Sequence, residues 1–251
     1  MVVDRQFVSR MSLRRDQVES FDRYPFCVPA VRHLDTLELH PKVTIFVGEN
    51  GSGKSTLLEA LAVSLGFNAE GGSKNFRFDT RASHSDLHSF LRVAKGVRRP
   101  RTGYFLRAES FFNVATEIER LDADPSIAPT IGPAYGDRSL HEQSHGESFL
   151  ALMTERFRGD GLYILDEPEA ALSPQRQLAV LSRMHDLARD GAQFVVATHS
   201  PILMAYPGAA LYQISAGGIE RVAVEDTEHF RVMRRFVDDP HSMIRMLVDT
   251  P

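Results

Sequence analysis

Residues 43–47 read VTIFV, and residues 48–55, which follow without a break, read GENGSGKS. The first segment is short, apolar and rich in β-branched residues, which predicts a buried strand. Residues 55–65 (STLLEALAVSL) have the composition of a helix, and Gly66 ends it. The glycines between strand and helix allow backbone N–H groups to turn inward around an anion, at the positive end of the helix. This order of elements predicts a phosphate-binding loop.

The loop matches the pattern G-x-x-x-x-G-K-[ST] at every fixed position. In such a loop the lysine, Lys54, reaches the β- and γ-phosphates of a nucleotide, and the hydroxyl of Ser55 binds Mg²⁺. We therefore expect ATP as the ligand and Mg²⁺ as the cofactor. The residues expected to bind the nucleotide in this loop are Gly48, Asn50, Gly51, Ser52, Gly53, Lys54, Ser55 and Thr56.

A second apolar segment, residues 162–165 (LYIL), ends in Asp166 and Glu167. A carboxylate at the end of a buried strand is well placed to hold Mg²⁺, usually through water, and we assign this role to Asp166. Glu167 is placed to act as the general base for an attacking water. Together with the phosphate loop, the acidic pair predicts the hydrolysis of ATP, with Lys54 also among the catalytic residues.

Strand-like and helical segments alternate along the rest of the chain. The expected strands are an edge strand within 5–14, buried strands at 103–106 and 193–197, and a terminal hairpin of 210–214 and 219–224. The expected helices are 111–121, 146–158, 174–189 and 226–248, the last interrupted near Pro240. Residues 68–101 are polar and show few periodic features.

This alternation predicts an α/β fold of the P-loop NTPase class, with a mainly parallel β-sheet core flanked by helices. We expect one domain over 1–251, with the core at about 1–66 and 159–251 and an inserted helical lobe at about 67–158. Its 251 residues, 43% hydrophobic and 25% charged, fit a globular protein of this size. The net charge of -4 gives no overall basic field, and the single cysteine, Cys27, indicates a reducing, cytoplasmic location. No apolar run is long enough to span a bilayer, so we expect no direct membrane insertion.

Ser144-His145-Gly146-Glu147 resembles the signature motif of the ATP-binding-cassette (ABC) superfamily, whose common form is Leu-Ser-Gly-Gly-Gln. Ser144 and Gly146 match its most informative positions, and Ser144 stands 22 residues before Asp166, close to the family spacing. The resemblance implies the fold of an ABC ATPase head. It also implies that Ser144 and Gly146 grip the γ-phosphate held by a second copy of the chain. The expected assembly is an ATP-dependent homodimer.

Two further segments support the resemblance. Residues 169–173 (EAALS) stand where the family has its D-loop, and His199 resembles the switch histidine that contacts the γ-phosphate. The family also has a glutamine that bridges Mg²⁺ to the lobe, and Glu109 is the candidate here, as a third metal-site residue. Tyr24 and Phe26 are both candidates for the aromatic that stacks on adenine, although either could be a core residue.

The segment 166–174 (DEPEAALSP) looks more like the soluble branch that contains SMC, RecF and overcoming-lysogenization-defect (OLD) ATPases than like transporter subunits. The spacing between Gly48 and Ser144 leaves no room for a coiled-coil arm, and 51 residues after Ser200 are too few for a nuclease domain. Three functional classes remain: a soluble process such as nucleic-acid maintenance or phage defence, the energy subunit of a transporter, and an ATP-gated regulator of a partner protein. Nucleic acid and an effector protein both stay open as partners.

Two other sequence patterns each have more than one interpretation. Residues 141–145 spell H-E-x-x-H, a zinc protease motif, but the glycines and proline around them disfavour the rigid helix that such a site needs. Residues 91–101 (LRVAKGVRRPR) hold five basic side chains, which form either a solvated loop or a contact for a phosphate backbone or an acidic protein.

Overall fold

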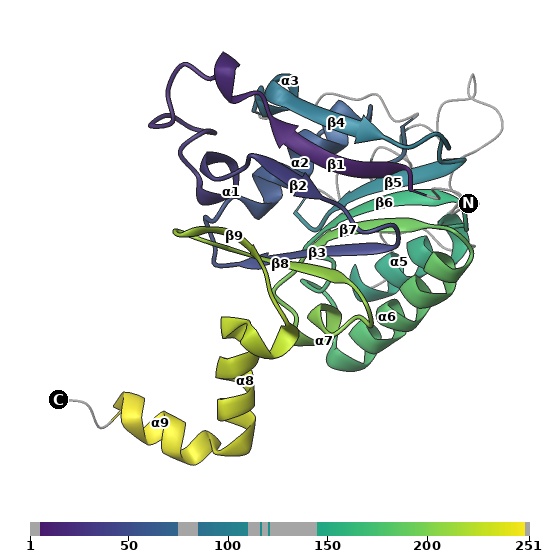
Figure 1. Cartoon of the computed structure of the whole chain (residues 1–251). Helices are drawn as coiled ribbons and strands as arrows, with labels where there is room; N and C mark the ends of the chain where they lie inside the picture. Colours follow the sequence, from purple (N-terminus) through teal and green to yellow (C-terminus); the bar gives the residue numbers. More distant parts are fainter. Residues whose placement is uncertain (1–5, 75–84, 110–115, 117–119, 121–144, 249–251) are drawn as a thin grey trace.

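The computed structural model describes residues 6–74, 85–109, 116, 120 and 145–248 (Figure 1). Within these residues, six strands form the main sheet, and all neighbours pair in parallel except the last two. In spatial order the strands are β5 (Thr102–Arg107), β6 (Gly161–Asp166), β7 (Gln193–Ala197), β3 (Val43–Gly48), β8 (Ala210–Ser215) and β9 (Gly218–Arg221). The structure confirms the predicted α/β fold with a mainly parallel sheet.

Both faces of the main sheet are covered, as the continuous apolar runs in its strands require. One face packs on α5 (His145–Ala151), the π-helical turn Leu152–Arg156, α6 (Pro174–Arg189) and α7 (Pro201–Met204). The other face packs on α2 (Lys54–Ser64) and on a second, smaller sheet. Side chains alternate between the faces: Val43, Ile45 and Val47 join the first core and Phe46 the second.

The smaller sheet is antiparallel, with the order β2 (Thr36–Glu38), β1 (Val8–Leu13) and β4 (Leu91–Lys95). The prediction of an edge strand near the N-terminus was therefore wrong, because β1 is the central strand. Residues 68–101, whose sequence shows few periodic features, contain α3 (Leu87–Phe90) and β4, which the sequence did not predict. Exposed Arg92 and Lys95 interrupt the apolar pattern of β4 and hid it in the sequence.

Gln193, at the start of β7, joins the two sheets. Its fully buried side chain accepts from the N–H groups of Phe7 and Val8, both at 3.0 Å. Its amide nitrogen donates to Val8 O at 2.7 Å and to His40 O at 3.0 Å. All four hydrogen-bonding positions of this amide are thus used, so a polar side chain is compatible with the core.

Residues 67–158 contribute strands to both sheets: β4 pairs with β1, and β5 is an edge strand of the main sheet. The boundaries expected for the inserted lobe remain a prediction, but these two strands belong to the sheets. The expected helix 146–158 is α5 followed by the π-helical turn, and the helix expected at 111–121 lies almost wholly outside the described residues.

The chain ends in two helices that project from the body (Figure 1). The predicted terminal hairpin is confirmed as β8 and β9, although β9 stops at Arg221 and is followed by the 3-10 turn Val224–Asp226. The predicted break near Pro240 is confirmed too, since α8 (Glu228–Asp238) ends just before it and α9 (Pro240–Val248) begins there. Neither helix buries a residue.

Candidate active site

The phosphate loop joins β3 to α2. Gly51 and Gly53 have φ angles of 80° and 93°, in the left-handed region that glycine adopts without steric cost. Gly53 also has no room for a side chain, because a Cβ there would lie 2.5 Å from Val28 Cγ2. The Ala30 N–H donates to Ser52 O at 2.8 Å, so α1 (Pro29–Arg32) supports the loop from behind. Packing as well as glycine therefore holds the backbone in its curved form.

The ammonium group of Lys54 lies across this loop. Nζ donates to Gly48 O at 2.8 Å and to Glu49 O at 3.0 Å, and the side chain is buried. Burial lowers the pKa of Lys54, and the charges of Glu167 and Asp166 oppose that shift by raising it. The structure thus brings the lysine and the acidic pair close together.

Ser55 and Asp166 meet although 111 residues separate them: Ser55 Oγ donates to Asp166 Oδ1 at 3.0 Å. Asp166 is 5% exposed, and burial raises the pKa of its carboxyl group to about 7, against the lowering effects of Ser55 and Arg107. A hydroxyl and a carboxylate are oxygen ligands of the kind that Mg²⁺ prefers. A divalent cation would also offset the carboxylate charge that burial disfavours. The two residues therefore fit the expected Mg²⁺ site.

Glu167 has a φ of 51°, a left-handed conformation that is uncommon outside glycine. Its N–H donates to Ala197 O at 2.9 Å, which ties the turn after β6 to the end of β7. Its Oε1 lies 3.6 Å from Nε2 of His199. Backbone strain of this kind persists only where the surrounding structure holds it, and it is enriched at functional sites.

His199 follows β7 directly and is held at two points. Its N–H donates to a carboxylate oxygen of Glu169, a residue of the expected D-loop. Its Nδ1 lies 3.0 Å from Nε2 of His229, the second residue of α8. Burial lowers the pKa of both imidazoles. The sequence did not reveal His229, because nothing in the segment TEHF links it to His199, 30 residues earlier in the chain.

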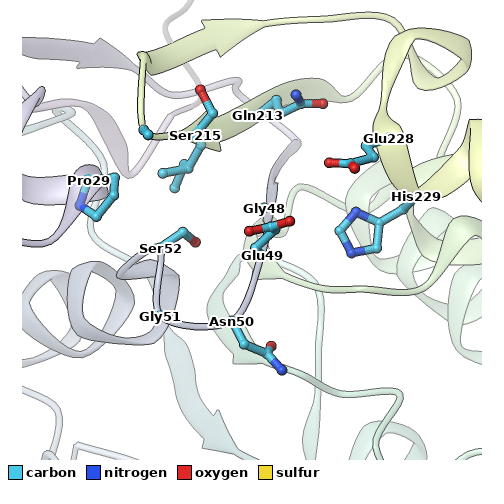
Figure 2. Close-up of a pocket in the computed structure, with 12 residues that line it drawn as sticks. Pro29, Gly48, Glu49, Asn50, Gly51, Ser52, Gln213, Ser215, Glu228 and His229 are labelled. Atoms are coloured by element: carbon cyan, nitrogen blue, oxygen red, sulfur yellow. The ribbon is translucent and has the colours of Figure 1, made fainter.

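His229 lines a cavity beside the phosphate loop (Figure 2). Pro29 lies on the opposite side of this cavity, and the hairpin residues 213–216 close a third side. Asn50, Gly48, Gly51 and Ser52, all expected to bind nucleotide, line it as well. The buried Ser52 Oγ has no hydrogen-bond partner among the described residues.

Glu109 stands just beyond β5 with a side chain that is 89% exposed. It lines one pocket together with Glu167, and its charge raises the pKa of Asp166, so it lies near the acidic pair. Its role at the metal remains a prediction. Arg107, which the sequence did not single out, lies 3.8 Å from Glu109 and pairs with the buried Glu59 at 2.7 Å. It stands opposite Asp166 in the sheet register.

The signature segment falls partly outside the described residues, which leave out 141–144, the first four residues of the H-E-x-x-H pattern with Ser144 as the last of them. Gly146 is buried as the second residue of α5. A Cβ on Gly146 would lie 2.7 Å from Arg176 Nη1 and 2.8 Å from Ala171 O. Its nearest neighbours are therefore the expected D-loop and the start of α6, not the phosphate loop.

The two candidate aromatics for adenine differ in their surroundings. Tyr24 is 64% exposed, and its hydroxyl lies 3.5 Å from Oγ1 of Thr56, another expected nucleotide contact. Phe26 packs edge-on against Phe90, with ring centroids 4.9 Å apart, and against Phe21. Of the two, only Tyr24 has a largely free ring beside the loop; Phe26 is partly buried and packs against the core.

A glycine loop between a buried strand and a helix, with Lys54 inside it and a Ser55–Asp166 pair beside it, defines a P-loop ATPase. Two family models described as AAA domains match the chain, one over residues 19–118 and one over residues 85–205. The second of these is also described with the AbiEii toxin of type IV toxin–antitoxin systems. The chain binds ATP with Mg²⁺ and is an ATPase.

Two of the three relatives described here are named as ATP-binding proteins. The hemin import ATP-binding protein HmuV of Nocardia farcinica is 31% identical over 210 residues, which cover 79% of this chain and 69% of the relative. The energy-coupling factor transporter protein EcfA1 of Fusobacterium nucleatum is 29% identical over 164 residues, 61% of each protein. The ABC transporter G family member STR2 of Medicago truncatula is 27% identical over 172 residues. The chain spans only 24% of the length of STR2.

Solved structures share the fold at low identity. An ABC transporter of metal-chelate type in an inward-facing conformation matches with a TM-score of 0.52 and 17% identity, over 91% of this chain and 88% of that one. The ATP-binding cassette MJ1267 matches with a TM-score of 0.50 and 19% identity, over 94% of this chain and 96% of that one. The 31% identity of this chain with HmuV, of which it covers 69%, shows that the chain belongs to the ATP-binding-cassette family of P-loop ATPases. Among the described residues, no helix combines the length and apolarity that crossing a membrane requires.

Proposed function

We propose that the chain hydrolyses ATP between two copies of itself, arranged head to tail. The observation that carries this proposal is the placement of Gly146, which backs onto Ala171 and Arg176. Gly146 is not among the residues that cluster at the phosphate loop, which are Lys54, Ser55, Asp166, Glu167 and His199. In a head-to-tail pair, Ser144 and Gly146 of each copy complete the site of the other.

Each residue then has a defined task. Lys54 and the loop amides bind the phosphates, and Ser55 and Asp166 hold Mg²⁺, which supplies charge neutralisation at the phosphates. Glu167 accepts a proton of the attacking water as the water oxygen bonds to the γ-phosphorus. The bond between the γ-phosphorus and the β–γ bridging oxygen breaks, and ADP leaves. His199 contacts the γ-phosphate through Nε2, which lies on the Glu167 side of its ring. The strained backbone of Glu167 supports its place in this group.

The Glu167→Gln variant tests both the base and the dimer. It keeps the contacts to phosphate and Mg²⁺, so we expect ATP binding without turnover and accumulation of an ATP-bound dimer. Light scattering with and without Mg·ATP measures the mass, and Glu155→Gln, an exposed carboxylate on the π-helical turn, is the control. A Glu167→Gln protein that stays monomeric under saturating ATP contradicts the two-copy arrangement.

A mixing experiment tests the shared site directly. Ser144→Arg and Lys54→Ala damage opposite halves of the composite site. A heterodimer of the two variants therefore has one site with both defects and one site with neither. We expect each variant alone to be inactive and the mixture to recover part of the activity. Heterodimers that form without any recovery would show that Ser144 does not serve the other copy.

We propose further that the dimer drives a soluble process on nucleic acid, such as nucleic-acid maintenance or phage defence, in the manner of the SMC, RecF and OLD branch. Support comes from a cavity at the end of β4 that is lined by Lys74, Lys95, Arg98 and Arg99. Arg98 is paired with Asp160 at 2.7 Å. Burial lowers the pKa of Lys74, and the charge of Lys95 lowers it further. Clustered cations of this kind suit a phosphate backbone.

Fluorescence anisotropy on labelled duplex and single strands tests this proposal. Wild-type protein with ATP should bind both without sequence preference and weaken steeply as salt rises. The double variant Arg99→Glu/Arg101→Glu should lose binding and keep its ATPase activity, because it leaves the Arg98–Asp160 pair intact. Lys42→Glu/Arg189→Glu reverses two exposed charges elsewhere and serves as the control. Equal binding by both double variants contradicts the proposal.

A second candidate is the energy-coupling subunit of a transporter, which the names of HmuV and EcfA1 favour. The third class, an ATP-gated regulator, would act on a soluble partner protein. Affinity purification of the tagged Glu167→Gln chain with ATP separates the three. A membrane permease, a soluble protein or nucleic acid in the eluate identifies the class, provided that Lys54→Ala fails to retain it.

A further inference from the structure

His229 contacts His199 and comes from outside the motifs of the family. Its Nε2 lies 3.0 Å from Nδ1 of His199, with ring centroids 5.1 Å apart. It stands in the first turn of α8, on the side of the cavity next to Glu49 in Figure 2. Burial lowers the pKa of both imidazoles, and the charge of Lys54 lowers each pKa further. Both rings therefore lie close enough to the lysine of the phosphate loop to interact with its charge.

The surroundings of His199 decide where its proton belongs. A neutral imidazole carries one N–H and one bare nitrogen. Nε2 of His199 is buried, has no hydrogen-bond partner in the described part of the chain, and faces Oε1 of Glu167 at 3.6 Å. Carboxylate and phosphate oxygens are acceptors, so a proton on Nε2 is favoured there. Nδ1 is then bare and needs a donor, and His229 presents its Nε2 at hydrogen-bond distance.

We propose that His229 is a positioning residue for ATP hydrolysis. It donates its Nε2–H to Nδ1 of His199, which fixes the orientation of that ring and keeps the proton of His199 on Nε2. The ring Nε2–H of His199 then points at Glu167 and at the position of the γ-phosphate. This is the way in which a second hydrogen bond commonly selects the tautomer of a functional histidine. The inference rests on the proposed contact between His199 and the γ-phosphate.

The attachment of α8 places His229 in the only part of the helix that is fixed to the body among the described residues. Thr227 is fully buried; its Oγ1 donates to Val224 O at 2.7 Å and accepts from the N–H of Phe230 at 3.3 Å. This cap sets the start of the helix, directly before His229. The rest of α8 buries no residue, so the contact with His199 depends on this first turn.

A pair of variants of equal length separates hydrogen bonding from packing. His229→Gln keeps an N–H donor near the position of Nε2, whereas His229→Met fills similar space and donates nothing. We expect His229→Met to lower kcat about tenfold with little change in KM for ATP, and His229→Gln to keep most of the activity. His241→Ala, on exposed α9, should behave as wild type. Equal rates for the Gln and Met variants overturn the proposal.

A double-mutant cycle shows whether His229 acts through His199. If it does, adding His229→Met to a His199→Ala chain causes no further loss, because the ring that it orients is absent. Additive losses overturn the inference. A wild-type rate for His199→Ala would instead refute the proposed function of His199. A slow His199→Ala chain beside a normal His229→Met chain refutes only the role of His229. Thermal melting of each variant shows that the fold is retained, and His229→Gln supplies the comparison if His229→Met melts early.

Discussion

Replacing Gln193 with leucine tests whether the position of the N-terminal sheet depends on one side chain. The leucine has nearly the same volume, so the core stays filled, but it can neither donate nor accept a hydrogen bond. The four groups that Gln193 satisfies are the N–H groups of Phe7 and Val8 and the carbonyls of Val8 and His40. Phe7 and Val8 are 2% and 1% exposed, so water does not reach their amides without movement.

The magnitude follows from these four bonds. Each contributes about 1 kcal/mol of net stability, so their loss costs about 4 kcal/mol. Removing the amide from the core returns about 1 kcal/mol of desolvation. The expected loss is about 3 kcal/mol, which for a chain of this size lowers the melting temperature by about 6–12 °C. Gln193→Glu should melt lower still, because a buried carboxylate faces the carbonyls of Val8 and His40 without a proton to donate.

Differential scanning calorimetry at one protein concentration, without nucleotide, measures these changes. Gln17→Leu introduces the same substitution at an exposed position and should leave the melting temperature within about 1 °C of wild type. The order wild type, Gln193→Leu, Gln193→Glu is the prediction. A Gln193→Leu protein that melts with wild type would show that the two sheets hold their positions by apolar packing alone.

Three further changes address the site. Lys54→Ala should lower ATP affinity about 100-fold by titration calorimetry, because it removes a charged contact to phosphate; an unchanged affinity contradicts the phosphate-loop assignment. Gly146→Val should reduce turnover at least tenfold with ATP affinity retained, since a Cβ would lie 2.8 Å from Ala171 O, and normal turnover argues against the signature contact. Glu59→Gln weakens the pair with Arg107 at 2.7 Å and should cost about 2 kcal/mol in urea unfolding, whereas no change would show that the pair contributes nothing.

The parts of the site that the sequence predicted are those in which local chemistry and local structure coincide. A phosphate loop needs glycine at Gly51 and Gly53 for the left-handed turns, and a lysine beside them, whatever the rest of the chain does. The acidic pair ends a strand that is buried on both faces and therefore continuously apolar. Each of the two motifs occupies a short stretch of about ten consecutive residues, so the sequence pattern alone identifies it.

The parts that the sequence missed depend on contacts between distant segments. β4 is an edge strand with Arg92 and Lys95 exposed, so its pattern resembles a polar loop, and without it β1 looked like an edge. Arg107 pairs with Glu59 on α2, and His229 contacts His199 just after β7, and these contacts are what link both residues to the site. No spacing rule links these pairs, because tertiary packing alone brings them together.

The way in which each element is anchored indicates which step α8 can affect. Ala30 and Val28 support the phosphate loop, and Asp166 ends a fully buried strand, so the groups expected to bind ATP and Mg²⁺ belong to the most stable part of the fold. The helix α8 buries no residue and is held at its first turn, so opening it costs little free energy compared with unfolding the sheet. Such an opening removes His229 from His199 and leaves Lys54 where it is. The position of α8 should therefore affect the rate of hydrolysis while the affinity for ATP stays the same.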